Sequence, residues 1–196
     1  SMTADLTLLL AALSIMTGVF VITGIPTKVG VLMLEAAGIN LIAMAVIAFL
    51  FGALVGTGLP PAPTYILTAL VIAPPMIKAG VDPWVVHFYA FFLAVWGELT
   101  PPTSVVAAVT AKIADASFMR TLGRALMLCV SLFTLMAGVF IRPELVIKPG
   151  VDQLAALGLI LVPTLGIVFA LQARFATDRM KNLTARGVLM VVSLFA

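Results

Sequence analysis

The sequence predicts an all-α integral membrane protein made of transmembrane helices, one re-entrant helical hairpin and one discontinuous helix. The 196 residues are 63% hydrophobic and only 10% charged, and their mean hydropathy is +1.24. Soluble domains are about 45–50% apolar and about 25% charged, so the lipid bilayer is the expected solvent. Two Gly- and Pro-rich stretches, GTGLPPAPTY and WGELTPPTS, interrupt the apolar segments.

Composition also limits the function classes. The single cysteine, Cys129, lies in an apolar run, so no disulfide framework or metal–thiolate cluster is possible within this chain. The net charge of +3 comes from a few Lys and Arg residues between apolar segments. No basic patch with interleaved aromatic residues indicates a nucleic-acid partner. The chain stops inside the apolar run GVLMVVSLFA, which suggests a fragment of a longer protein.

A spanning helix needs about 20 apolar residues. The segment 62–78 is too short and too rich in proline to cross comfortably, and we expect it to be the return arm of a hairpin. The hairpin covers about 31–78 and its tip is GTGLPPAP. Such backbone is tolerated only where protein buries it or where it lines a cavity. The expected spans are 6–24, 31–53 (the outward arm), 84–111, 120–141 and 153–173, with a sixth from about 187.

Charges between the spans predict their orientation. Segments 174–186 and 112–124 carry the largest excess of Lys and Arg, whereas 142–152 is balanced. Basic loops favour the cytoplasm, which places the first two segments inside and the third outside. Counting back along the chain, the hairpin opens to the outside.

The two breaks predict one binding site. Secondary transporters bind ions and substrates at discontinuous helices near the middle of the membrane, where half-helix ends and unwound carbonyls are available. Proline donates no N–H, so the carbonyls about four residues before Pro60, Pro61, Pro101 and Pro102 lose their helical partner. The candidate substrate- or ion-binding residues are Gly56, Thr57, Gly58, Pro60, Thr64, Gly97, Glu98, Thr100, Pro101, Pro102, Thr103 and Ser104. The sodium candidates among them are Gly56, Gly97, Thr100 and Thr103.

Three ionisable residues lie in or near the spans. Glu98 adjoins the second break, and a carboxylate inside a span is by default a functional candidate; the alternative is a structural acceptor for neighbouring backbone groups. Glu35 is expected to be a solvated or structural charge near an interface. His87 is expected near the outer interface, in a structural role.

These motifs resemble the large M subunit of the tripartite ATP-independent periplasmic (TRAP) transporters, most closely the fused 4TM/12TM permeases. The resemblance covers about residues 5–146 and rests on the order and spacing of its motifs. In the family, Thr-Thr usually follows Gly-Leu-Pro and Val-Ala commonly follows Thr-Pro-Pro; this chain has Pro61-Ala62 and Thr103-Ser104 there. The matching elements are Gly56, Gly58, Leu59, Pro60, Tyr65, Ala73-Pro74, His87-Phe88 and Thr100-Pro101-Pro102.

The resemblance implies a sodium-coupled importer of organic anions, often carboxylates, that works by an elevator-type motion in a bacterial or archaeal cytoplasmic membrane. Residues 3–146 would form the second of two inverted repeats, with a broken helix at about 84–111. Residues 147–196 would add truncated C-terminal transmembrane helices. Sodium would be the coupling ion. The implied partners are a periplasmic substrate-binding protein, the rest of the permease with its first repeat, and the small Q-type subunit or its fused equivalent.

Other classes remain open from sequence alone. One is an elevator-type symporter that needs no binding protein, and another is a non-transporting structural membrane subunit. An intramembrane enzyme would need a catalytic set such as HExxH or paired aspartates. The chain has one His and one isolated mid-span carboxylate, so we expect no enzyme.

Overall fold

The computed structural model describes residues 2–38, 40–57, 59–101 and 103–195, and every regular element in them is a helix. Contacts divide the chain into two compact units, residues 1–123 and 124–196. The helices are α1 (Met2–Ile22), α2 (Ile25–Ala37), α3 (Leu41–Gly56), α4 (Pro61–Lys78), α5 (Pro83–Gly97), α6 (Val105–Ile113), α7 (Phe118–Leu128), α8 (Ser131–Ile141), α9 (Glu144–Ile147), α10 (Val151–Gln172) and α11 (Arg179–Phe195).

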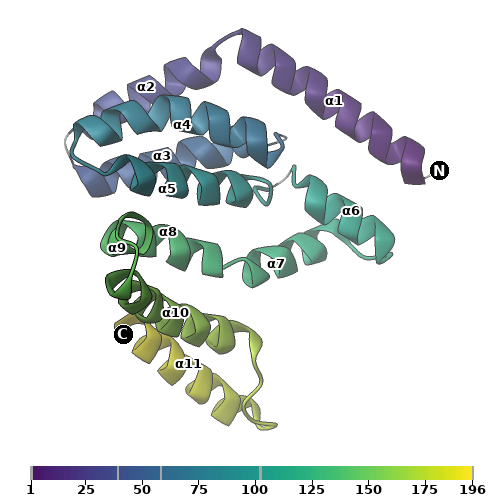
Figure 1. The fold of residues 1–196 in the computed structure, drawn as a ribbon. Coiled ribbons are helices and arrows are strands. Elements are labelled where there is room, and N and C mark those ends of the chain that lie inside the picture. The colour runs from purple at the N-terminus through teal and green to yellow at the C-terminus, as the bar shows by residue number, and fades with distance from the viewer. Residues whose placement is uncertain (1, 39, 58, 102, 196) are drawn as a thin grey trace. The chain divides into compact units, whose positions relative to one another are not determined.

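The core of the first unit is the helix group α2–α5. These four helices lie alongside one another, and α4 packs most extensively on α5 (Figure 1). The Tyr89 hydroxyl on α5 donates a hydrogen bond to the Ala45 carbonyl of α3 at 2.6 Å. Large apolar side chains fill the space between the helices, and the most deeply buried are Phe51, Ile72, Met76, Leu93, Val55, Val85 and Val86.

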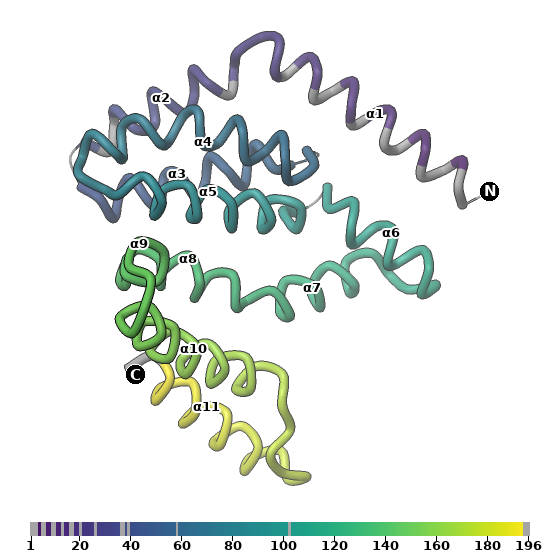
Figure 2. Tube along the Cα trace, in the orientation of Figure 1, coloured from purple at the N-terminus to yellow at the C-terminus, as the bar shows by residue number. Residues whose placement is uncertain are grey.

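The chain reverses direction between α3 and α4, as the tube in Figure 2 shows. Helix α3 ends at Gly56 and α4 begins at Pro61, so the return arm expected at 62–78 agrees with α4. The second break also appears where the sequence predicts it. Helix α5 ends at Gly97 and helix α6 begins at Val105, with non-helical backbone between them.

The outward arm expected at 31–53 is wrong, because the structure divides this segment into two helices. Helix α2 ends at Ala37, and Gly38 has a φ of 64°, a left-handed conformation that glycine adopts without steric cost. The Asn40 side chain then caps α3 by accepting hydrogen bonds from the amides of Ile42 (3.0 Å) and Ala43 (3.2 Å). The hairpin proper is therefore formed by α3 and α4.

The second unit contains the long helix α10, which packs on α8, α9 and α11. Two helical stretches in the described part of the chain are long and apolar enough to cross a membrane: Phe118–Ile141 and Val151–Gln172. These agree with the spans expected at 120–141 and 153–173. The last helix begins at Arg179, earlier than residue 187, because the Asp178 carboxylate accepts a 2.9 Å hydrogen bond from the Met180 amide at its start.

Candidate functional site at the hairpin tip and the helix break

Glycines bring the hairpin tip and the helix break into direct contact. A Cβ built on Gly56 would overlap the Cα of Gly97, and one built on Gly97 would lie 2.9 Å from the Cα of Gly56. One turn earlier on α3, a Cβ on Gly52 would overlap the Leu93 side chain of α5. Small residues four apart on one face allow two apolar helices to approach closely. The predicted convergence of the two breaks is therefore present at Gly56 and Gly97.

Hydrogen bonds around the tip occupy most of its polar groups. The Thr57 hydroxyl donates to the carbonyls of Ala53 and Leu54, at the end of α3. Thr64 is fully buried in the first turn of α4, and its hydroxyl donates to the Pro60 carbonyl at 2.9 Å. The Thr64 methyl group is 3.6 Å from where a Gly97 Cβ would be. Thr64 therefore packs against the break while its hydroxyl stabilises the hairpin.

The break unwinds through a series of short turns. The Leu99 amide donates to the Trp96 carbonyl at 2.8 Å, and the Thr100 amide to the Gly97 carbonyl at 3.0 Å. The chain re-enters a helix at Ser104, whose side chain accepts a 3.1 Å hydrogen bond from the Ala107 amide. Ser104 is thus the N-cap of α6, and its hydroxyl has a structural role.

The carbonyls expected to lack helical partners find donors three residues further along. Gly97 O accepts from Thr100 N, and Gly56 O accepts a long bond of 3.4 Å from Leu59 N. A carbonyl oxygen has two lone pairs, so each still has capacity for one more partner. Carbonyl ligation at Gly56 and Gly97 remains chemically open.

Three buried hydroxyls in this unit have no hydrogen-bond partner among the described residues: those of Thr68, Thr100 and Thr103. Thr68 is fully buried in α4, one turn after Thr64. A buried polar group without a partner costs about 1–3 kcal/mol, so such groups in a native structure call for a further ligand, an ion or a water. Thr100 and Thr103 were predicted from sequence. Thr68 was missed, although its spacing of four from Thr64 places both on one helix face.

Glu98 lies at the C-cap of α5 and is half-buried. Glu98 directly follows Gly97, the glycine that contacts Gly56, and precedes Thr100 by two residues. A half-buried carboxylate among apolar residues needs a compensating partner. Pro60 and Pro101 are exposed, and Gly58 and Pro102 lie outside the described residues.

His87 joins the two most closely packed helices of the unit. The Tyr65 hydroxyl of α4 and Nδ1 of His87 on α5 are 2.9 Å apart, within hydrogen-bonding distance. The Trp96 ring of α5 lies against the Phe49 ring of α3, with the ring centroids 6.5 Å apart and the planes tilted by 38°. Both contacts hold α5 against the hairpin. In the described residues no group of three or more His, Cys, Asp or Glu side chains forms a metal-binding cluster.

Two helical stretches long and apolar enough to cross a membrane are consistent with an integral membrane protein of the helical class. A family model, "Tripartite ATP-independent periplasmic transporter, DctM component", matches residues 1–145. The chain therefore belongs to the DctM family of TRAP transporter permease components. No curated protein and no solved structure matches it. The match includes the hairpin tip, the break and the contact between Gly56 and Gly97, whereas α10 and α11 lie beyond it.

Proposed function

We propose that this chain is part of the membrane permease of a sodium-coupled importer, which takes up organic anions, chiefly carboxylates, delivered by a periplasmic substrate-binding protein. Membership of the DctM family supports the transporter class. The observation that carries the mechanism is the contact of Gly56 with Gly97, together with the Thr100 and Thr103 hydroxyls of the same break, which are buried without a partner among the described residues. Elevator-type movement of the unit that contains them would expose the site alternately to the two sides.

Helix lengths support a hairpin that enters the membrane and turns back. At about 1.5 Å per residue, the 16-residue helix α3 is about 24 Å long and the 15-residue helix α5 about 22 Å. Both fall short of the roughly 30 Å hydrocarbon core, so helices that start at an interface would end inside it. In this proposal the tip and the break lie within the membrane, where their exposed backbone is available to a ligand.

The coupling ion in this proposal is sodium, held by hard oxygen ligands. The Thr100 and Thr103 hydroxyls would each supply one oxygen, and the carbonyls of Gly56 and Gly97 would supply others. Thr57 and Ser104 keep their hydroxyls in helix caps and are left out of the ligand set. Glu98 would compensate the charge of the cation without needing to bind it directly.

Orientation is part of the proposal and has its own test. We propose that the turn after α4 and the segment before α10 face the periplasm, and that the segment before α11 faces the cytoplasm. Gly80 and Gly150 have φ values of 96° and 122°, so cysteine is strained there. Cysteines at the exposed positions Ala79, Lys148 and Thr177 are better probes. Labelling of Ala79→Cys and Thr177→Cys from the same side would overturn the orientation.

The function itself is tested by uptake in proteoliposomes that contain the complete permease. We expect organic-anion uptake only when both a sodium gradient and the cognate binding protein are present. Uptake that persists without the binding protein would favour a binding-protein-independent symporter. Uptake that is unaffected by sodium would remove the ion from the mechanism.

A further inference from the structure

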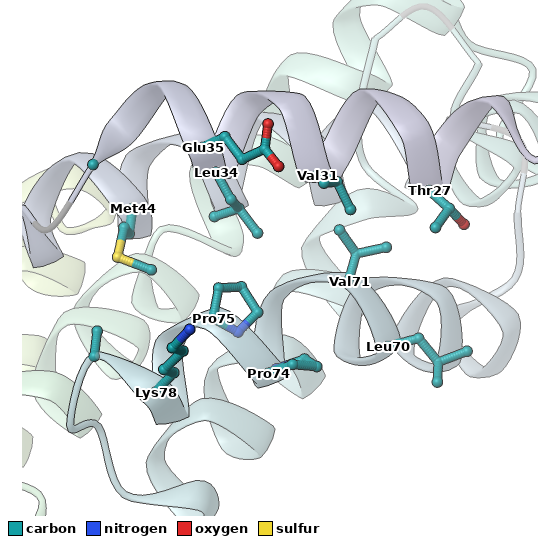
Figure 3. Close-up of a pocket in the computed structure, with 12 residues that line it drawn as sticks. Thr27, Val31, Leu34, Glu35, Met44, Leu70, Val71, Pro74, Pro75 and Lys78 are labelled. Atoms are coloured by element: carbon teal, nitrogen blue, oxygen red, sulfur yellow. The ribbon is translucent and has the colours of Figure 1, made fainter.

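A groove of about 570 Å³ runs between helices α2 and α4, away from the tip and the break (Figure 3). Its walls are mainly apolar and include Val31 and Leu34 of α2, Met44 of α3, and Leu70 and Val71 of α4. Helix α2 packs closely on α4 and α3, since a Cβ on Gly30 would overlap Val71 Cγ1 and lie 3.0 Å from Phe51 Cε2. Leu70 is 69% exposed, so the groove has an open, apolar flank.

Charged side chains of opposite sign lie in the half of this groove nearer Gly38 and Ala79. Glu35 of α2 and Lys78 of α4 both line it, and both are exposed (Figure 3). They face the groove from different helices and form no ion pair with each other within the described residues. Thr27 lies toward the opposite end. The groove thus has two opposite charges toward this end and an apolar seam that continues to Thr27, a polarity pattern that suits an amphiphile.

Consecutive prolines form part of the same wall. Pro74 and Pro75 lie inside α4 and line the groove. Neither has an N–H, so the carbonyls of Leu70 and Val71 lose their ordinary helical donors four residues on. Leu70 and Val71 line the groove as well.

We propose that this groove binds one membrane glycerophospholipid with a primary-ammonium headgroup. Lys78 attracts the phosphate, Glu35 accepts hydrogen bonds from the ammonium group, and an acyl chain lies along Val31 and Val71. An anionic headgroup would satisfy Lys78 but face the Glu35 carboxylate, and a trimethylammonium headgroup has no N–H to donate. The proposal rests on the membrane-integral character of the family and not on sodium coupling or substrate.

The end of helix α4 at Lys78 explains why the headgroup is placed near Lys78 and Glu35. Helix α4 ends at Lys78, and the chain turns through Gly80 to Asp82 before α5 begins. Long Lys side chains near helix ends reach toward the membrane interface, where phosphates lie. The apolar seam runs from there along α2 and α4, in the direction that an acyl chain takes from the interface.

Native mass spectrometry of the complete, delipidated permease tests the proposal. The probes are phosphatidylethanolamine, phosphatidylcholine and phosphatidylglycerol, added in equal amounts. We expect one tightly retained phosphatidylethanolamine, and we expect Glu35→Gln to reduce its preference over phosphatidylcholine by about two- to fivefold, the effect of one partly exposed charge. Lys78→Gln should weaken retention of all three phospholipids. Asp152→Asn and Lys112→Gln change exposed charges outside the groove and should leave the preference unchanged.

A second variant blocks the groove without touching its charges. Val31 is 44% exposed, so Val31→Trp can be accommodated while its ring fills the seam. We expect it to remove the retained lipid whatever the headgroup, with unchanged thermal unfolding. Retention of phosphatidylethanolamine by both Val31→Trp and Glu35→Gln at the wild-type level overturns the proposal. Failure to retain any lipid in the folded wild-type permease, as expected if another segment of the permease covers the groove, also overturns it. Neither result bears on sodium-coupled uptake.

Discussion

Buried hydroxyls in helices α10 and α11 differ from those in the break between α5 and α6. In residues 124–196, the Thr164 hydroxyl donates to the Ile160 carbonyl at 2.7 Å and lies 2.8 Å from the Thr134 hydroxyl, and Ser193 donates to the Leu189 carbonyl at 2.7 Å. In residues 1–123, the hydroxyls of Thr68, Thr100 and Thr103 are buried without a partner in the described chain. Two of these three lie in the break between α5 and α6.

This difference distinguishes hydroxyls that stabilise their own helix from hydroxyls that are available to a ligand. A hydroxyl that donates to the carbonyl four residues earlier satisfies itself within its own helix, so Thr164 and Ser193 need no other partner. The hydroxyls of Thr100 and Thr103 lie in unwound backbone and donate to no such carbonyl among the described residues, and leaving them buried costs free energy. The same residue type therefore indicates structure in α10 and α11 and a ligand in the break.

The largest expected effect is steric. Gly56→Val should prevent the close approach of α3 and α5, because its side chain meets the backbone of Gly97, which cannot rotate away. We expect loss of folded, detergent-extractable permease, or destabilisation of at least about 1–3 kcal/mol, the usual cost of overpacking. Gly158→Ala is the matched control, since a Cβ there meets nothing within 4 Å. Normal thermal unfolding of Gly56→Val would show that the contact is not required.

A smaller effect is expected in the second unit. Thr164→Val removes a buried hydroxyl that is hydrogen-bonded, and should lower the free energy of unfolding by about 1 kcal/mol. It should leave the sodium dependence of uptake unchanged. Chemical or thermal unfolding of the purified permease measures the first quantity. A changed sodium dependence would mean that the C-terminal helices take part in ion binding.

The smallest effect is expected at Glu98. Glu98→Gln keeps the size of the side chain and deletes its charge, so sodium should be held less tightly while the fold is retained. For a half-buried carboxylate we expect a rise of about two- to fivefold in the sodium concentration that gives half-maximal uptake. Asp152→Asn, an exposed carboxylate in α10, is the control. Wild-type sodium activation in Glu98→Gln would assign Glu98 a structural role.

Sequence reasoning located the hairpin tip and the break because Gly and Pro determine local backbone directly. The return arm, the break after Gly97 and the two long spans all follow from proline positions and apolar length. The division at Gly38 was missed because one glycine and one asparagine inside an apolar run give little signal until their backbone is seen. The direct contact of Gly56 with Gly97 depends on packing between helices, and so does the lack of a described partner for Thr68. Neither can be predicted from the sequence alone.

Sodium-dependent thermal stabilisation of the complete permease shows whether the break binds sodium, when wild type is compared with Thr100→Val and Thr164→Val. An ion that binds only the folded state stabilises it by about 2.7 kcal/mol at a hundred times its dissociation constant. We expect sodium to raise the unfolding temperature of wild type and of Thr164→Val. Thr100→Val should lose most of this rise, although it unfolds at the normal temperature without sodium. An equal rise in all three proteins would contradict a sodium site at the break.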